Sequence, residues 1–290
     1  MGLLSGLNGL GLGNLEDMDL YAPPAKEKEE EEIPEEVPEA PAKPAAPEIK
    51  ESDYVFEKSY TCPVCEKEFK ALTVKASKAR LVGTDRDLRP RYEHIEPLKY
   101  DVVMCPICGC AAITRYWQGI TETQRKKIKE GISVNFVSKK YTGDTYSYDE
   151  ALERYQMALA NAMVKQAKPA EKAYICLRAG WTLRSRAENL DPADADYKEE
   201  YERTKTMERD FLESALEGFV SARATETPPI CGMDEMTLDY LIAALSVDFE
   251  KYDQAAKLVG SLLTNRNISS RMKDKALDLK DAILKAKGRA

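Results

Sequence analysis

The sequence predicts an α+β protein that is mostly α, in which a small four-cysteine, zinc-ribbon-like β module precedes an all-α, tetratricopeptide-like helical domain. Two Cys-Pro-x-Cys pairs in the first half of the chain predict the module. Helical periodicity from about Tyr148 to the C-terminus predicts the helical domain. A disordered N-terminal tail completes the prediction, because residues 1–53 hold 14 acidic residues against 4 lysines, whereas residues 54–290 hold 36 acidic against 39 basic residues.

The paired cysteines are the strongest motif in the chain. Each Cys-x-x-Cys places two thiols on one tight turn, and two such turns supply the four ligands of a tetrahedral zinc site. We expect one structural zinc ion, because catalytic zinc needs an open coordination position. The 39 residues between the pairs are expected to carry a hairpin of their own. The predicted ligands are Cys62, Cys65, Cys105 and Cys108.

Two further residues near these turns matter to the geometry. Gly109 follows the second pair, where the turn favours a residue that tolerates a positive φ. Glu66 takes the corresponding place after the first pair and departs from this preference. His94, the only histidine of the chain, is interpreted as a loop residue and not as a fifth ligand.

The N-terminal region divides into two parts. Residues 1–20 carry five glycines and five leucines within the first thirteen positions, and glycine disfavours a free helix by about 1 kcal/mol relative to alanine. This segment is either an unstructured terminus or a docking peptide that orders on a partner or on the protein's own groove. Myristoylation of Gly2 is rejected, because Gly6 replaces the expected hydroxyl residue. Residues 21–53, with seven prolines, are predicted to be a disordered acidic linker.

The remaining boundaries follow from local patterns. Residues 54–118 are assigned to the four-cysteine module, with strand-like alternation on either side of the first pair and before the second. Residues 119–147 are predicted to form a helix and a connecting loop. The capping box of Thr121 and Gln124 begins that helix, and Gly131 is expected to end it. Residues 148–290 form the predicted helical domain.

Three segments of this domain share the pattern of a second tetratricopeptide helix, in which a small residue is followed by a larger one four positions later. Ala179-Gly180 and Ile242-Ala243 mark candidate first helices. The charged stretch 191–209 is expected on the outside of extended helices. Because the copies are irregularly spaced, a generic helical bundle remains the alternative. The three copies are Ala151-x3-Tyr155-x2-Ala158, Ala215-x3-Phe219-x2-Ala222 and Ala255-x3-Val259-x2-Leu262.

The order of these motifs resembles a bacterial family catalogued as domain of unknown function 2225, over roughly residues 55–285. The resemblance rests on TCPVCEKEF, SKARLVGTDRDLRPRYEHIEPLKYDVVMCPICG, LRAGW and YLIAALSVDFEKYDQAA. It implies a zinc-ribbon-like start, an insert with Asp-x-Asp and a tetratricopeptide-like end, and it implies no activity. Glu66 stands where the family usually has glycine, and Cys110 where it usually has an aromatic residue. Cys110 is expected to be a buried apolar group and not a ligand.

Enzymatic motifs are absent from the sequence. A single histidine excludes an HExxH site, and no phosphate-binding glycine loop or Gly-x-Ser-x-Gly elbow is present. Asp85 and Asp87 are able to face the same way in a strand, but the arginines beside them favour ion pairs over acid–base chemistry. Cys176 is assigned to the helical core and Cys231 to a turn.

We therefore expect a non-enzymatic adaptor that binds a protein or peptide partner through its helical domain. The six basic residues within 74–92 keep a nucleic-acid-associated zinc protein open as an alternative, and the paired thiols keep a redox sensor open. No secretory signal or membrane span is evident, so a cytoplasmic location without membrane contact is expected. The sequence does not specify the oligomeric state.

Overall fold

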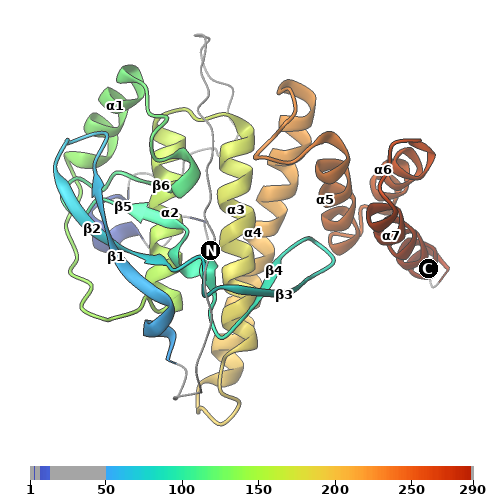
Figure 1. Cartoon of the computed structure of the whole chain (residues 1–290), viewed down its shortest axis with the longest axis horizontal. Helices are drawn as coiled ribbons and strands as arrows, with labels where there is room; N and C mark the ends of the chain where they lie inside the picture. The colour runs from blue at the N-terminus through green and yellow to red at the C-terminus, as the bar shows by residue number, and fades with distance from the viewer. Residues whose placement is uncertain (1–2, 4–6, 14–49, 289–290) are drawn as a thin grey trace.

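The computed structural model describes Leu3, residues 7–13 and residues 50–288. β1, β2, β5 and β6 lie on one side of α3 and α4, and α5, α6 and α7 lie on the other side (Figure 1). The strands pair as three separate antiparallel hairpins, β1–β2, β3–β4 and β5–β6. Their bounds are Val55–Thr61 for β1, Glu68–Val74 for β2, Arg80–Thr84 for β3, Pro90–Glu93 for β4, Val102–Met104 for β5 and Ala111–Ile113 for β6.

The two Cys-Pro-x-Cys turns each connect the strands of one hairpin. The first turn joins β1 to β2, in which Thr61 pairs with Glu68. The second joins β5 to β6, in which Met104 pairs with Ala111. The strands expected around each cysteine pair are therefore confirmed. All residues of β5 and β6 are buried, whereas β1 exposes most of its residues and β2 buries only Phe69 and Ala71, so the second hairpin lies deeper in the fold.

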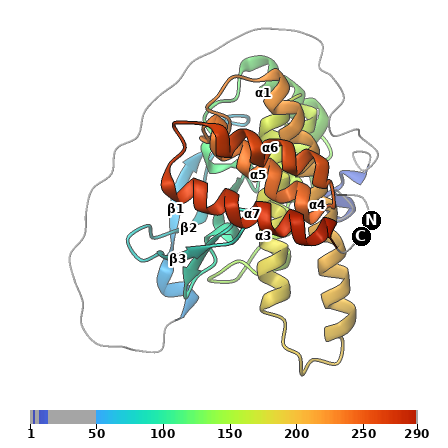
Figure 2. The same ribbon diagram turned by 90° about the vertical axis from the view of Figure 1, so that its right-hand side faces the viewer.

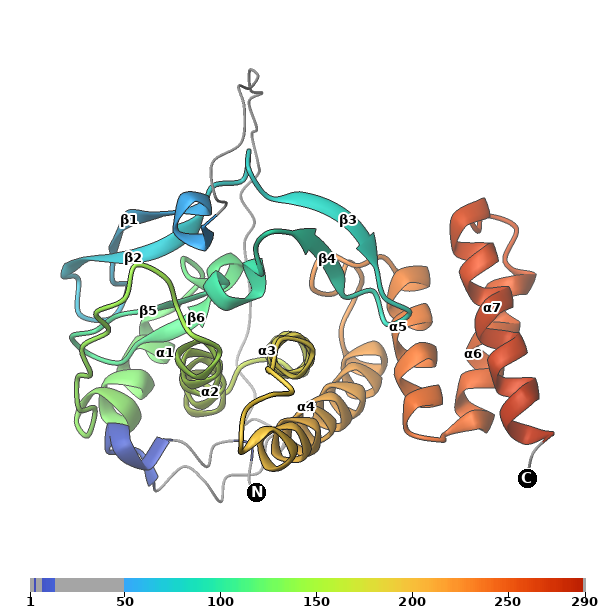
Figure 3. The same cartoon turned by 90° about the horizontal axis from the view of Figure 1, so that it is seen from below.

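The third hairpin, β3–β4, is the one expected between the cysteine pairs. It extends away from the four-cysteine region, passes over α3 and ends beside α5 (Figure 3). Its register shifts between Leu81 and Gly83, where one strand bulges. The hairpin thus brings residues 85–89 to the helices, far from the cysteines that precede and follow it in the sequence.

The helices account for most of the chain, as the sequence predicts. α3 packs along α4, α5 packs on α6, and α6 packs on α7. Gly180 of α3 permits a close approach, because an ideal Cβ there would lie 2.7 Å from Cδ2 of Leu212 in α4. The bounds are Glu122–Ile128 for α1, Tyr148–Val164 for α2, Pro169–Glu188 for α3, Tyr197–Thr225 for α4, Glu235–Asp248 for α5, Tyr252–Thr264 for α6 and Ser270–Lys287 for α7.

The three sequence copies fall in α2, α4 and α6, and each of their nine pattern residues exposes 2% or less of its surface. The long spacing in the middle pair is explained by the lengths of α3 and α4, which have 20 and 29 residues. Their extended ends project from the body of the molecule (Figure 2). Residues 191–203 of the charged stretch lie on this projection and are exposed or partly exposed. The expectation is wrong for Thr204 and Glu208 of the same stretch, which are buried because they face the body of the molecule.

The hydrophobic core joins the strands to the helices. One continuous cluster of buried side chains contains Cys62 and Cys105 together with residues of α2, α3 and α4. A second cluster fills the space between α5, α6 and α7. The four-cysteine hairpins therefore share their interior with the helical part of the chain.

Two expectations about boundaries need correction. Gly131 does not end the helix that begins at Thr121, because it lies inside a π-helical turn, Lys129–Ser133, that continues α1. Its role is packing, since a Cβ there would lie 2.7 Å from Cγ1 of Val164 in α2. Residues 51–53, assigned to the linker, belong to a 3-10 helix, Glu51–Tyr54, in which Glu51 accepts a hydrogen bond from Tyr100.

The rest of the predicted linker, residues 21–49, lies outside the described residues, as does most of the segment 1–20. Within the described part of the chain, no helix has the length and apolar character to cross a membrane.

Candidate functional site

The four predicted metal ligands come together in one cluster. Their sulfur atoms all lie within 4.8 Å of one another. Two of the separations, Cys62 to Cys108 and Cys65 to Cys105, are 3.5 and 3.7 Å. Four thiolates bound tetrahedrally at the usual zinc–sulfur length are about 3.8 Å apart, and a disulfide is about 2 Å long. The cluster therefore has the donor set and the dimensions of a four-thiolate metal site.

The two turns that hold the thiols have the same backbone geometry. In the first, Glu66 N–H donates to the Cys62 carbonyl at 2.9 Å; in the second, Gly109 N–H donates to the Cys105 carbonyl at 3.0 Å. Glu66 and Gly109 both adopt a positive φ, of 62° and 71°. The expectation at Gly109 is confirmed, and Glu66 adopts the same conformation despite the cost of a side chain.

The pKa values of the clustered thiols are shifted in opposite directions. Hydrogen bonds from Cys105, Cys108 and Cys110 hold the pKa of Cys62 far below its usual range. Bonds with Cys105 and Cys62, together with burial, raise the pKa of Cys108. A divalent ion would supply the positive charge that lets all four thiols ionise.

The remaining cysteines and the histidine lie in the environments that the sequence predicts. Cys110 is fully buried and lies beside Cys62 without joining the four-thiol cluster. His94 is exposed, lies 3.5 Å from Glu93 and does not belong to the four-thiol cluster. Cys176 is buried in α3, and Cys231 lies in a turn, where Tyr116 donates a hydrogen bond to its sulfur at 3.3 Å. Burial raises the pKa of Cys231 to about 11.

The aspartates of the insert form ion pairs, as expected, but they lie in the turn of the β3–β4 hairpin and not in a strand. Asp85 accepts from Arg89 Nε at 2.6 Å. Burial raises the pKa of Asp85, but hydrogen bonds from Arg91 and Arg89 outweigh this effect and hold it below its usual value. Asp87 is almost fully buried and accepts from Trp181 Nε1 at 2.9 Å. These carboxylates hold the hairpin to α3.

Arginines of the same hairpin are also paired. Arg89 is buried and donates to Ser185 at 3.0 Å and to Glu188 at 2.6 Å, both in α3. Arg86 pairs with Asp248 at the end of α5. The basic side chains that suggested nucleic-acid binding are therefore neutralised in part by carboxylates of this chain.

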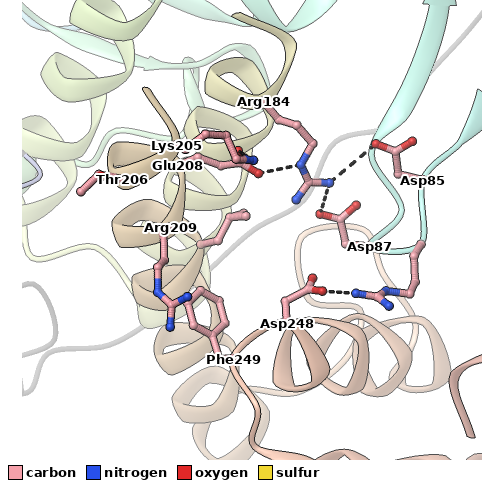
Figure 4. A pocket seen from close by; sticks show the side chains of 11 residues that line it. Asp85, Asp87, Arg184, Lys205, Thr206, Glu208, Arg209, Asp248 and Phe249 are labelled. Atoms are coloured by element: carbon pink, nitrogen blue, oxygen red, sulfur yellow. Dashed lines mark hydrogen bonds and ion pairs between the residues drawn. The ribbon is translucent and has the colours of Figure 1, made fainter. Parts of the chain in front are cut away.

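A cavity of about 680 Å³ lies where the hairpin turn meets α3, α4 and the end of α5 (Figure 4). Arg184 crosses its wall, 2.9 Å from Asp87 and 2.7 Å from Glu208. The remaining lining residues are Asp85, Arg86, Lys205, Thr206, Arg209, Leu212, Asp248 and Phe249.

The helical side of this cavity was not found from the sequence. Arg184 and Glu208 are charged residues on helix faces that are otherwise buried, and this mismatch is the one signal that marks them. Arg184 lies four positions after Gly180 and so shares its face of α3. A single sequence does not indicate that this face meets Asp87, which lies far earlier in the chain.

Comparison with known proteins adds one match. No curated protein and no solved structure matches the chain. A family model described as an uncharacterized protein conserved in bacteria, DUF2225, matches residues 55–283, a range that begins at β1 and ends within α7. The four-thiol centre, the charged hairpin and the helices that it contacts all fall within this range, and the chain belongs to this family.

Proposed function

We propose that the protein is a non-enzymatic adaptor, stabilised by one structural zinc ion, that binds an acidic segment of a partner protein in the cavity at the hairpin turn. The zinc assignment is supported by the donor set, because four thiolates at tetrahedral spacing favour this ion. The four thiols fill the coordination sphere and leave no position for a substrate. The rest of the proposal depends on the cavity.

Arg209 is the observation that carries the proposal. Its guanidinium lies over the ring of Phe249, with 5.3 Å between the guanidinium carbon and the ring centroid. Within the described residues it forms no ion pair, although each carboxylate that lines the cavity has a basic partner. A carboxylate brought by a partner would therefore find Arg209 available.

The surroundings of Arg209 favour a peptide over a nucleic acid. Leu212 and Phe249 supply an apolar wall beside the guanidinium. The charges that line the cavity balance, so it lacks the excess of positive charge that binds a nucleic-acid backbone. The four carboxylates are Asp85, Asp87, Glu208 and Asp248, and the four basic side chains are Arg86, Arg184, Lys205 and Arg209. A segment that carries one carboxylate next to an apolar side chain matches this lining.

The test compares Arg209→Ala with Arg203→Ala, which removes the same charge from an exposed site on the same helix. Arg203 pairs with Glu200 and does not line the cavity. Tagged wild-type and variant proteins are purified from the host, and the co-purifying proteins are quantified by mass spectrometry. We expect a partner that Arg209→Ala reduces about tenfold or more, as for a lost charged hydrogen bond, and that Arg203→Ala retains.

Two outcomes would contradict the proposal. Equal recovery of every partner from both variants would exclude the cavity as the binding site. No protein above the level of a control without bait would exclude the adaptor function. Zinc content and thermal unfolding are measured on each variant, so that a loss of binding is not confused with a loss of fold.

A further inference from the structure

A short N-terminal segment is packed into the core of the helical part. Leu7, Leu10 and Leu12 expose 1% of their surface or less and belong to the same buried cluster as the cysteines. The segment turns once as a 3-10 helix, Leu7–Leu10, which Leu12 N–H closes through a hydrogen bond to the Leu7 carbonyl at 3.2 Å. This turn, dark blue in Figure 3, lies against α2. The segment thus orders on the protein's own surface.

Specific contacts fix the position of this segment. Val137 N–H donates to the Leu10 carbonyl at 3.0 Å, and Gln156 of α2 donates to the Leu3 carbonyl at 3.2 Å. Gly11 has a φ of 78°, and an ideal Cβ there would lie 2.1 Å from the carbonyl oxygen of Asn135. Only glycine fits at this position. The surface that binds this segment, formed by α2 and residues 135–137, is called the groove below. It recognises three leucines, two main-chain acceptors and one obligatory glycine.

The walls of the groove belong to the family domain, but its occupant does not. The family match begins at residue 55 and includes α2 and residues 135–137. The occupant precedes that match and is separated from it by residues 14–54, which contain seven prolines. A separate segment that reaches a formed groove through such a connection behaves as a ligand at high effective concentration.

The groove also adjoins the second cysteine turn. The ring of Phe136 lies against Gly109, where an ideal Cβ would be 2.5 Å from Cδ2 of the ring. The residues on either side of Phe136 both contact the N-terminal segment: Asn135 and Val137. A change in the second turn therefore acts directly on the groove.

We propose that residues 7–13 are an internal peptide ligand, that the four-thiol centre holds the groove in its binding shape, and that loss of the metal releases the segment. A groove that keeps its metal but has lost this segment is therefore expected to bind a free peptide of residues 1–13. This proposal depends on neither Arg209 nor the partner assigned to its cavity.

The first test measures amide hydrogen exchange in the full-length, zinc-loaded protein before and after chelation. We expect exchange in residues 7–13 to accelerate at least tenfold, with much smaller changes in α6 and α7, which have their own core. Unchanged protection of residues 7–13 after the zinc has been removed would overturn the proposal, as would an equal increase throughout the chain.

The second test uses Gly11→Ala in the full-length protein, which displaces the segment without altering a metal ligand. We expect this variant to keep its zinc and to bind a fluorescent peptide of residues 1–13 at least tenfold more tightly than the wild type, in which the groove is filled. A peptide that carries the same substitution is the matched control and is expected not to bind. Failure of the wild-type peptide to bind the variant, or equal binding of both peptides, would overturn the proposal.

Discussion

The two cysteine turns have the same backbone hydrogen bonds but contact different parts of the fold. The second turn lies against α2, where Asn161 donates to the Gly109 carbonyl at 2.9 Å. The first turn buries Cys62 and Val64 but is more open at its end, where Cys65 is half-buried and the exposed Glu66 pairs with Arg125 of α1 at 2.8 Å. The second turn is thus in closer contact with the helices, and the thiol cluster links the first turn to it. Substitutions in the two turns should therefore have unequal effects.

The largest expected effect is that of removing a thiol from the second turn. Cys108→Ser should abolish binding of one equivalent of zinc and destabilise the fold by several kcal/mol, because structural zinc sites contribute about 10 kcal/mol or more to folding. Cys65→Ser should also lose the metal but unfold less of α2. Metal analysis and hydrogen exchange test both expectations. Cys110→Ala should retain zinc, because Cys110 lies outside the cluster. Loss of zinc from this variant would contradict the ligand assignment.

The second-largest loss of stability is expected for Gly109→Ala. The new Cβ would be forced into the Phe136 ring at a positive φ, so we expect a loss of about 2–4 kcal/mol in the free energy of unfolding, measured by urea titration. Gly119→Ala is the control, because no atom lies within 4 Å of its Cβ position. Equal effects at both glycines would show that the second turn is not packed against residue 136.

Asn161→Ala should have a smaller effect. It leaves the Gly109 carbonyl buried without its side-chain donor, which costs about 1–3 kcal/mol. Asn189→Ala, which removes an exposed amide at the end of α3, should cost less than half as much. If hydrogen exchange in the second turn stays at its wild-type rate in Asn161→Ala, the contact with α2 does not stabilise that turn.

The smallest effect is expected in the first turn. Glu66→Gly removes the strain of a side chain at φ 62°, worth about 1 kcal/mol, and loses an exposed ion pair worth about 0–1 kcal/mol. The free energy of unfolding should therefore stay within about 1 kcal/mol of the wild type. Glu66→Ala separates the two contributions, because it loses the ion pair and keeps the Cβ. A large loss in Glu66→Gly would mean that the first turn depends on Arg125.

Features that depend on nearby residues were predictable from the sequence. The clustering of the four cysteines, the hairpin between the two pairs and the capping box of Thr121 and Gln124 are confirmed, because each is encoded within a short stretch of chain. Gly131 shows the limit of this approach. A glycine near a helix end favours termination, but the presence of Val164 beside it decides its role, and a local pattern does not include that neighbour.

Features that depend on distant pairings were not predictable. The arginines near Asp87 suggested local ion pairs, yet its partner is Arg184 in α3. The leucines of the N-terminal segment left two interpretations open, since their number indicates burial but not the surface that buries them. In both cases the residue types indicate the kind of contact, but only the folded structure identifies the residues on the other side of that contact.

The route of the β3–β4 hairpin has a consequence for the order of events during synthesis. Arg89 donates to groups that follow it in the chain by 96 and 99 residues, and Arg86 pairs with a group 162 residues later. On the ribosome, both cysteine pairs therefore emerge well before the hairpin between them has a surface on which to dock. The thiols are free to bind zinc first, and the hairpin joins the helices only when α3 and α5 have been made.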